Sequence, residues 1–131
     1  MAQDLAGRVS REPNGSPRLA LLLCADEEVR DLAGFWLTGA GLRVISAGDG
    51  GEAGQQILDK PVAVLVIDTL PIYLPGLPSL RELKERRNLR VVFIPQYDEK
   101  PEAGVARIAG VDAVLARPLR KEMLLSALNA P

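Results

Sequence analysis

Apolar runs of strand length alternate along the chain with segments of helical periodicity, beginning near residue 18. The runs are apolar almost throughout, as expected for strands that are buried on both faces of a sheet. They predict strands over residues 19–23, 42–46, 62–67, 90–94 and 113–116. Between them apolar residues recur every three or four positions, which is typical of amphipathic helices. The predicted helices are residues 29–40, a weak helix within 48–60, residues 78–87, residues 101–109, and a last helix containing Leu124, Leu125 and Leu128.

This order is a strand followed by a helix, five times over. Strands that are separated by helices run parallel, and a parallel sheet needs helices on both faces. The pattern therefore predicts a three-layer α/β domain, doubly wound, with right-handed crossovers. The chain of 131 residues is long enough for one such domain. Residues 1–17 are polar and rich in Gly, Pro, Asn and Ser, so we expect a flexible leader there and the domain over residues 18–131.

The charges are nearly balanced, with 16 Lys and Arg against 17 Asp and Glu and a net charge of −1. No strong positive field attracts nucleic acid or an anionic membrane, and no apolar stretch is long enough to span a bilayer, so neither is an expected partner. We expect a cytoplasmic protein. Cys24 is the single cysteine and the chain has no histidine, which excludes an intrachain disulfide and a His/Cys zinc cluster. Any metal would be bound by carboxylates and carbonyls, as Mg²⁺ is.

Several chemically distinctive residues follow the predicted strands. The buried third strand ends on Asp68, and the first strand is followed by Cys24, Ala25 and Asp26. Pro95 and Gln96 come after the fourth strand, and Arg117 and Pro118 after the fifth. Ligands bind open α/β sheets at the carboxyl ends of the strands, near the point where the winding reverses. We therefore expect these residues to converge at one edge of the sheet.

Four motifs in order resemble the receiver domain of bacterial two-component response regulators: "LLLCADEEVRDL", "AGDGGEA", "VLVIDTL" and "AGVDAVLARPL". The resemblance covers residues 18–129 and implies a five-stranded flavodoxin-like (βα)5 fold with strand order 2-1-3-4-5. It also implies a phosphorelay function, in which a phosphoryl group passes from a kinase histidine to an aspartate of the receiver with Mg²⁺ at the site.

By this resemblance Asp68 is the phosphoacceptor, but the other site positions depart from the family. The two acidic positions fall on Cys24 and Ala25, which supply no oxygen ligand from their side chains. The hydroxyl position falls on Pro95, which has neither a hydroxyl nor an N–H. Arg117 takes the lysine position, and Val114 takes the position of the aromatic switch.

Each candidate residue has two interpretations. Asp68 is either a phosphoacceptor or a retained carboxylate that forms an ion pair with Arg117. Asp26 and Glu27 are either displaced Mg²⁺ ligands, acting with Asp68 and the carbonyl of Leu70, or acids that favour a helix N-terminus. Cys24 is either a redox-sensitive thiol or a small core residue.

The preferred hypothesis is a pseudo-receiver, a non-enzymatic module that binds a protein partner without a phosphorylation cycle and needs no cofactor. The alternative is a working receiver that is phosphorylated on Asp68 with Mg²⁺. A flavin- or cobalamin-binding domain is less favoured, because "CADEEV" is no phosphate loop and no histidine is present. By resemblance, the partner, a kinase, a regulator or an output protein, would contact the fourth helix, fifth strand and fifth helix of a monomer or weak homodimer. The residues expected on that face are Arg107, Asp112, Arg120, Lys121 and Glu122.

Overall fold

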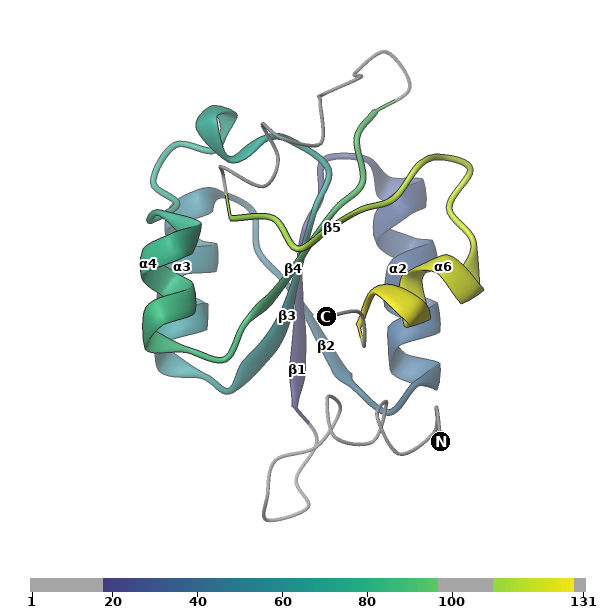
Figure 1. The fold of residues 1–131 in the computed structure, drawn as a ribbon, viewed down its shortest axis with the longest axis horizontal. Coiled ribbons are helices and arrows are strands. Elements are labelled where there is room, and N and C mark those ends of the chain that lie inside the picture. The colour runs from purple at the N-terminus through teal and green to yellow at the C-terminus, as the bar shows by residue number, and fades with distance from the viewer. Residues whose placement is uncertain (1–17, 97–109, 129–131) are drawn as a thin grey trace.

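A computed structural model describes residues 18–96 and 110–128, and these form a parallel five-stranded sheet between two layers of helices (Figure 1). The strands are β1 (Leu19–Leu23), β2 (Arg43–Ser46), β3 (Val62–Ile67), β4 (Arg90–Phe93) and β5 (Ala113–Val114). Their order in the sheet is β2-β1-β3-β4-β5, which confirms the predicted fold class. The helices are α2 (Glu27–Gly39), α3 (Gly50–Asp59), α4 (Leu80–Arg86) and α6 (Lys121–Ala127), with a 3₁₀ turn η1 (Pro71–Tyr73).

Two predicted segments, the leader over residues 1–17 and the helix over 101–109, lie outside the described residues. Within the described part of the chain, none of the helices is long and apolar enough to cross a membrane.

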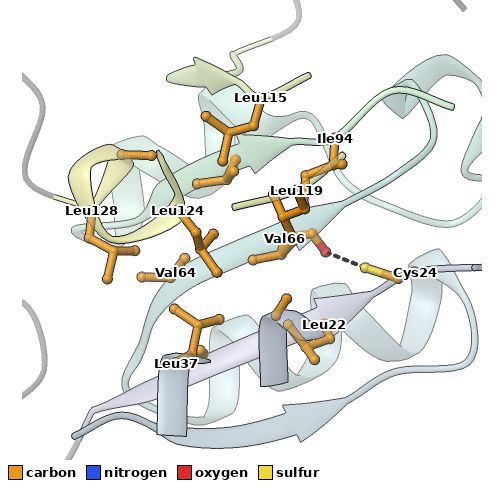
Figure 2. Close-up of a cluster of buried hydrophobic side chains, with 14 of the residues drawn as sticks. Leu22, Cys24, Leu37, Val64, Val66, Ile94, Leu115, Leu119, Leu124 and Leu128 are labelled. Atoms are coloured by element: carbon orange, nitrogen blue, oxygen red, sulfur yellow. Dashed lines mark hydrogen bonds between the residues drawn. The ribbon is translucent and has the colours of Figure 1, made fainter. Parts of the chain in front are cut away.

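Each face of the sheet carries its own apolar core. Helices α2 and α6 cover one face and α3 and α4 cover the other (Figure 1). On the α2/α6 face, Leu37 and Leu124 pack with Val64 of the central strand in one buried cluster (Figure 2). Burial on both faces explains why β1 and β3 are apolar at every position rather than at alternate ones.

The side-chain alternation of β3 decides where Asp68 points. Val64 and Val66 belong to the core beneath α2 and α6, whereas Leu65 and Ile67 belong to the core beneath α3 and α4. Asp68 is the next position on the Val66 side, because successive side chains of a strand point to opposite faces. Its carboxylate is therefore directed toward the start of α2.

Strand β5 is shorter than predicted, ending at Val114 rather than at residue 116. The backbone pairing continues only as far as the amide of Leu115, which donates to the carbonyl of Phe93 at 2.9 Å. The chain then turns through Arg117 and Pro118, and proline has no N–H to donate to a strand ladder.

The loop that follows Asp68 packs closely against the first turn of α3. Gly50 is buried there, and a Cβ atom built on it would lie 2.6 Å from the carbonyl oxygen of Pro75 and 2.7 Å from the amide nitrogen of Leu77. Gly76 in the same loop has a φ of +85°, a conformation that favours glycine. These glycines allow the loop after Asp68 to dock on α3.

We predict that Gly50→Ala destabilises the fold by about 1–3 kcal/mol, because the new methyl group overlaps backbone atoms that have little freedom to move. The matched control is Gly51→Ala in the same turn, whose added Cβ would have its nearest contact at 3.4 Å, with Asp49. That control should be neutral or stabilising by up to about 1 kcal/mol, as alanine favours helices over glycine. Urea unfolding measures both values, and equal effects would contradict the close packing.

Candidate functional site

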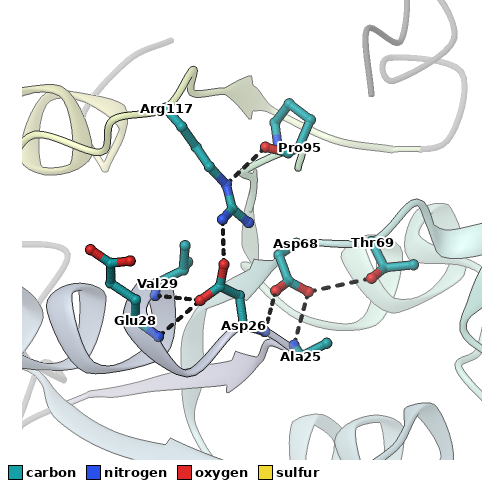
Figure 3. Close-up of polar contacts among 8 residues, drawn as sticks. All are labelled: Ala25, Asp26, Glu28, Val29, Asp68, Thr69, Pro95 and Arg117. Carbon is teal, nitrogen blue, oxygen red and sulfur yellow. Dashed lines mark hydrogen bonds and ion pairs between the residues drawn. The ribbon is translucent and has the colours of Figure 1, made fainter. Parts of the chain in front are cut away.

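The loops after β1, β3, β4 and β5 meet at the carboxyl end of the sheet (Figure 3). Asp68 lies at the centre, the β1–α2 loop with Ala25 and Asp26 lies beside it, and Pro95 and Arg117 come from the other two loops. Strand β1 is flanked by β2 and β3, so the chain reverses its winding here. The structure thus brings together the residues that the strand ends were expected to supply.

Asp68 is buried, with 1% of its surface exposed, and backbone amides engage both of its carboxylate oxygens. Ala25 N donates to Oδ1 at 3.0 Å and Asp26 N donates to Oδ2 at 2.8 Å. The hydroxyl of Thr69 adds a longer hydrogen bond to Oδ1 at 3.3 Å. A buried carboxylate is stabilised by such charge-assisted hydrogen bonds, so Asp68 connects the end of β3 to the loop that begins α2.

The cation of the site pairs with Asp26. Arg117 Nη1 forms a short ion pair with Asp26 Oδ2, and Arg117 Nε donates to the carbonyl of Pro95 at 3.0 Å. The ion pair that the structure describes for Arg117 is thus with Asp26, whereas the ion pair with Asp68 was one of the two interpretations of that carboxylate. The backbone amides of the β1–α2 loop satisfy Asp68, and the guanidinium is directed to the carboxylate at the start of α2 (Figure 3).

Asp26 is the N-cap of α2. Its Oδ1 accepts hydrogen bonds from Glu28 N at 2.9 Å and Val29 N at 3.3 Å, which satisfies two amides that have no partner within the helix. The hydrogen bond from Arg117, reinforced by these helix amides, holds the pKa of Asp26 below its ordinary value. The interpretation of Asp26 and Glu27 as acids at a helix start is thus the one that the contacts favour, with Glu27 in the first turn.

Cys24 packs as a small core residue at the end of β1. Its thiol is buried and donates to the carbonyl of Val66 at 3.6 Å (Figure 2). Burial, followed by the negative charge of Asp68, raises the pKa of Cys24 to about 12. A thiol this basic stays protonated at neutral pH, which opposes the interpretation of Cys24 as a reactive redox sensor.

The side chains at this site do not fit a Mg²⁺ ion. Cys24 and Ala25 offer no side-chain oxygen, and both oxygens of Asp26 already serve the helix amides and Arg117. Glu27 is exposed and pairs with Arg30 at 3.6 Å, while the carbonyl of Leu70 accepts the amide of Tyr73 at 2.9 Å. Within residues 18–96 and 110–128, no group of three or more acidic, Cys or His side chains is arranged to bind a metal.

Two further positions that the resemblance singled out have other roles in the structure. Pro95, at the hydroxyl position, contributes its carbonyl oxygen to Arg117. Val114, at the aromatic position, is 41% exposed on β5. Neither side chain can hydrogen-bond a phosphoryl group.

Sequence reasoning missed two features of the site. The hydroxyl of Thr69 lies against Asp68, and its place directly after the aspartate was the available signal. A cavity of about 620 Å³ also opens beside Asp68, between residues 48–51, which lead from β2 into the first turn of α3, and residues 74–76 after η1. The "AGDGGEA" motif supplies part of this wall, but its approach to Asp68 depends on the docking of two distant loops.

The residues expected on the partner face differ in exposure. Arg120, Lys121 and Glu122 are exposed at the start of α6. Asp112 was wrongly placed there, because its side chain is partly buried, pairs with Lys84 and accepts the amide of Val91 at 2.8 Å. Arg107 lies outside the described residues.

The chain is similar in sequence to response regulators, although no family model matches it. Response regulator RR06 of Streptococcus pneumoniae is 27% identical over 112 residues, which cover 84% of this chain and 51% of RR06. The transcriptional regulatory protein GlrR of Escherichia coli is 29% identical over 115 residues, covering 86% of this chain and 26% of GlrR. The chain therefore spans about half of the first relative and about a quarter of the second.

Solved structures share the fold. NtrX from Brucella abortus aligns with a TM-score of 0.66 and 26% identity, over 84% of this chain and 26% of NtrX. A receiver domain protein from Clostridium thermocellum aligns with a TM-score of 0.67 and 19% identity, over 86% of this chain and 91% of that chain. CheY of Borrelia burgdorferi, solved with CheX, beryllofluoride and Mg²⁺, gives a TM-score of 0.71 at 19% identity, over 94% of this chain and 95% of that chain. In sequence similarity, in strand order and in the aspartate at the end of β3, the chain is similar to the receiver domains of response regulators.

Proposed function

We propose that this receiver domain acts as a signalling module that binds a protein partner without being phosphorylated. The observation that carries the proposal is the state of Asp68, which is buried while backbone amides hydrogen-bond to both of its oxygens. The proposal assigns no enzymatic reaction and no cofactor to the chain. It places this domain among the proteins that transmit a signal by contact alone.

Phosphoryl transfer requires an accessible nucleophile and a centre that neutralises the negative charge of the transferred group. A phosphodonor would have to reach an Asp68 oxygen that is held by Ala25 N or Asp26 N and shielded from solvent. Among the residues that the structure describes, the side chains beside Asp68 supply no set of oxygen ligands for a metal, and Arg117 is paired with Asp26. The transition state would therefore lack most of its electrostatic stabilisation.

The ion pair between Asp26 and Arg117 links the β5–α6 loop to the start of α2. The Arg117 side chain is only 7% exposed, and it bridges the loop after β4 to the α2 N-cap through Pro95 and Asp26. A buried, permanently charged guanidinium is costly to separate from its partner. These contacts favour one fixed arrangement of the loops, which suits a module that presents a constant surface.

Receiver domains interact with kinases and output domains, and we propose that this one binds its partner through β5 and α6. Val114 is an exposed apolar residue on β5, and the charged residues Arg120, Lys121 and Glu122 lie at the start of α6. Protein interfaces commonly combine an apolar centre with a polar rim, and these two elements supply exposed residues of both kinds. Arg117 fixes the loop that joins the two elements.

The first test is an amide NMR spectrum of the free protein, repeated with millimolar Mg²⁺ and then with beryllofluoride, a mimic of an aspartyl phosphate. We expect no saturable change at Asp68, Leu70, Gln96 or Arg117. The described side chains offer no set of metal ligands, and both oxygens of Asp68 accept hydrogen bonds from backbone amides. Saturable shifts there that Asp68→Asn abolishes would instead establish a working receiver that uses Mg²⁺.

A gain-of-function variant serves as the positive control for this spectrum. Ala25 is exposed and lies at one of the missing acidic positions, so Ala25→Asp adds a carboxylate beside Asp68 without filling the core. We expect Mg²⁺ to shift the amides near Asp68 in this variant and not in the parent protein. An Mg²⁺ response of equal size in both proteins would contradict the proposed reason for inactivity.

The second test concerns the stability that the Asp26–Arg117 ion pair contributes and how that contribution depends on pH. Because the pKa of Asp26 is lowered in the folded state, the pair stabilises the protein fully above the ordinary value of 3.8. That stabilisation is lost as the pH falls through the lowered value. Asp26→Asn keeps an N-cap side chain but removes the charge, so it should unfold more readily at about pH 7 and lose less stability than the parent as the pH falls below about 4.

Denaturant unfolding across this pH range measures the difference between the parent and the variant. Glu85→Gln is the matched control, because Glu85 is an exposed acid on α4 and lies far from the site in sequence. A control that reproduces the pH behaviour of Asp26→Asn would show that general charge repulsion, rather than the ion pair, is responsible.

A further inference from the structure

A positively charged cavity lies at the amino end of the sheet, opposite the edge that carries Asp68. Its volume is about 410 Å³, and it is bordered by the residue before β1, the start of β3, the α4–β4 loop and the start of β4. A smaller cavity of about 190 Å³ adjoins it and shares Arg18, Ala63 and Asn88 with it. The function proposed above uses neither cavity.

The lining of the larger cavity contains three cationic side chains, Arg18, Lys84 and Arg90, and one acidic side chain, Asp112. Both oxygens of Asp112 are engaged, Oδ1 by Lys84 and Oδ2 by the amide of Val91. Three cations against one acid give the lining a net positive formal charge. Arg87 contributes a fourth cation to the adjoining cavity. Anions are attracted to a cationic concave site, because the surrounding protein screens the charges of the site less than water does.

Arg90 supplies the observation that points to a ligand. Its Nε donates to the carbonyl of Ala127 at 2.9 Å, which anchors the side chain to the end of α6. Its Nη2 atom is buried and has no hydrogen-bond partner in the part of the chain that the structure describes. An unmatched buried donor on a charged group is costly and rare in folded proteins, so an acceptor in the cavity that Arg90 lines would be stabilising once a small shift of the side chain exposes this donor to it.

We propose that this amino-end cavity binds a small soluble anion that carries a phosphate group. A guanidinium donates two parallel N–H bonds to phosphate oxygens, and a neighbouring ammonium adds a further charge-assisted bond. Arg90 and Lys84 provide these two kinds of donor within one cavity, and the exposed side chain of Asn88 can hydrogen-bond the rest of the ligand. The larger cavity has room for a phosphate and a small attached group.

The test is an amide NMR titration with inorganic phosphate and with pyrophosphate, each compared with sodium chloride at matched ionic strength. We expect saturable shifts at Asn88, Arg90 and Asp112 with the phosphates only. Asp68 and Ala25 should not shift, so the result is independent of whether the carboxyl-end site is active. Shifts that chloride reproduces, or the absence of saturation with both phosphates, would overturn the proposal.

Three variants test whether the shifts arise from binding in this cavity. Arg90→Gln should abolish the saturable shifts. Asn88→Asp places an acid at an exposed position of the cavity and should weaken phosphate binding by about fivefold through like-charge repulsion, without disturbing the core. Arg81→Gln removes an exposed charge that does not line either cavity and should leave the affinity unchanged.

Two of these variants, Arg90→Gln and Asn88→Asp, change residues that line the cavity, and only the first changes a partly buried side chain. If Arg90→Gln fails to fold, Asn88→Asp decides the question by itself. Equal losses of affinity in Asn88→Asp and Arg81→Gln would show general electrostatic attraction rather than a site, and would overturn the proposal.

Discussion

The buried carboxylate of Asp68 organises the carboxyl end of this sheet. A buried charge is tolerated only where hydrogen bonds replace its hydration, and here the amides of Ala25 and Asp26 do so. These bonds join the end of β3 to the loop that starts α2. They therefore fix the start of the helix whose other residues cover one face of the sheet, and the position of Asp26 follows from them.

Asp26 in turn determines where the cation of the site lies. Its side chain caps α2 with one oxygen and holds Arg117 with the other, and Arg117 reaches back to the carbonyl of Pro95. Three loops are thus connected through polar contacts within the protein alone. In a receiver that binds Mg²⁺ and a phosphoryl group, added ligands would make such connections. These contacts are the basis for the proposal of a module whose surface does not depend on a phosphorylation cycle.

The two ends of the sheet differ in electrostatic character. At the carboxyl end the acidic and basic groups of the site are matched, since amides hold Asp68 and Arg117 holds Asp26. At the amino end cationic side chains outnumber acidic ones around a cavity, and one buried donor of Arg90 has no partner within the described residues. Unsatisfied polar groups, rather than satisfied ones, indicate where an external ligand would lower the free energy.

The strand and helix periodicities predicted the sheet and most of its elements, because burial on both faces forces apolar runs such as residues 62–67. The resemblance to receiver domains also implied a role for Asp68 and the departures at Cys24, Ala25, Pro95 and Val114, which can be read from the order and spacing of the motifs. The partner of Arg117 could not be predicted in this way. Asp26 and Asp68 are both acids near the guanidinium, and only the geometry of the loops decides between them.

The same distinction holds for the rest of the molecule. The sequence by itself determined the fold class, the location of the chemically distinctive residues at the strand ends and the absence of acidic side chains at the two positions after β1. Tertiary structure alone decided that backbone amides satisfy Asp68, that Asp112 turns inward to Lys84, and that Arg18, Lys84 and Arg90 surround one cavity. Periodicity reports which face of an element is buried, whereas a pairing between distant loops depends on distances that exist only after the chain has folded.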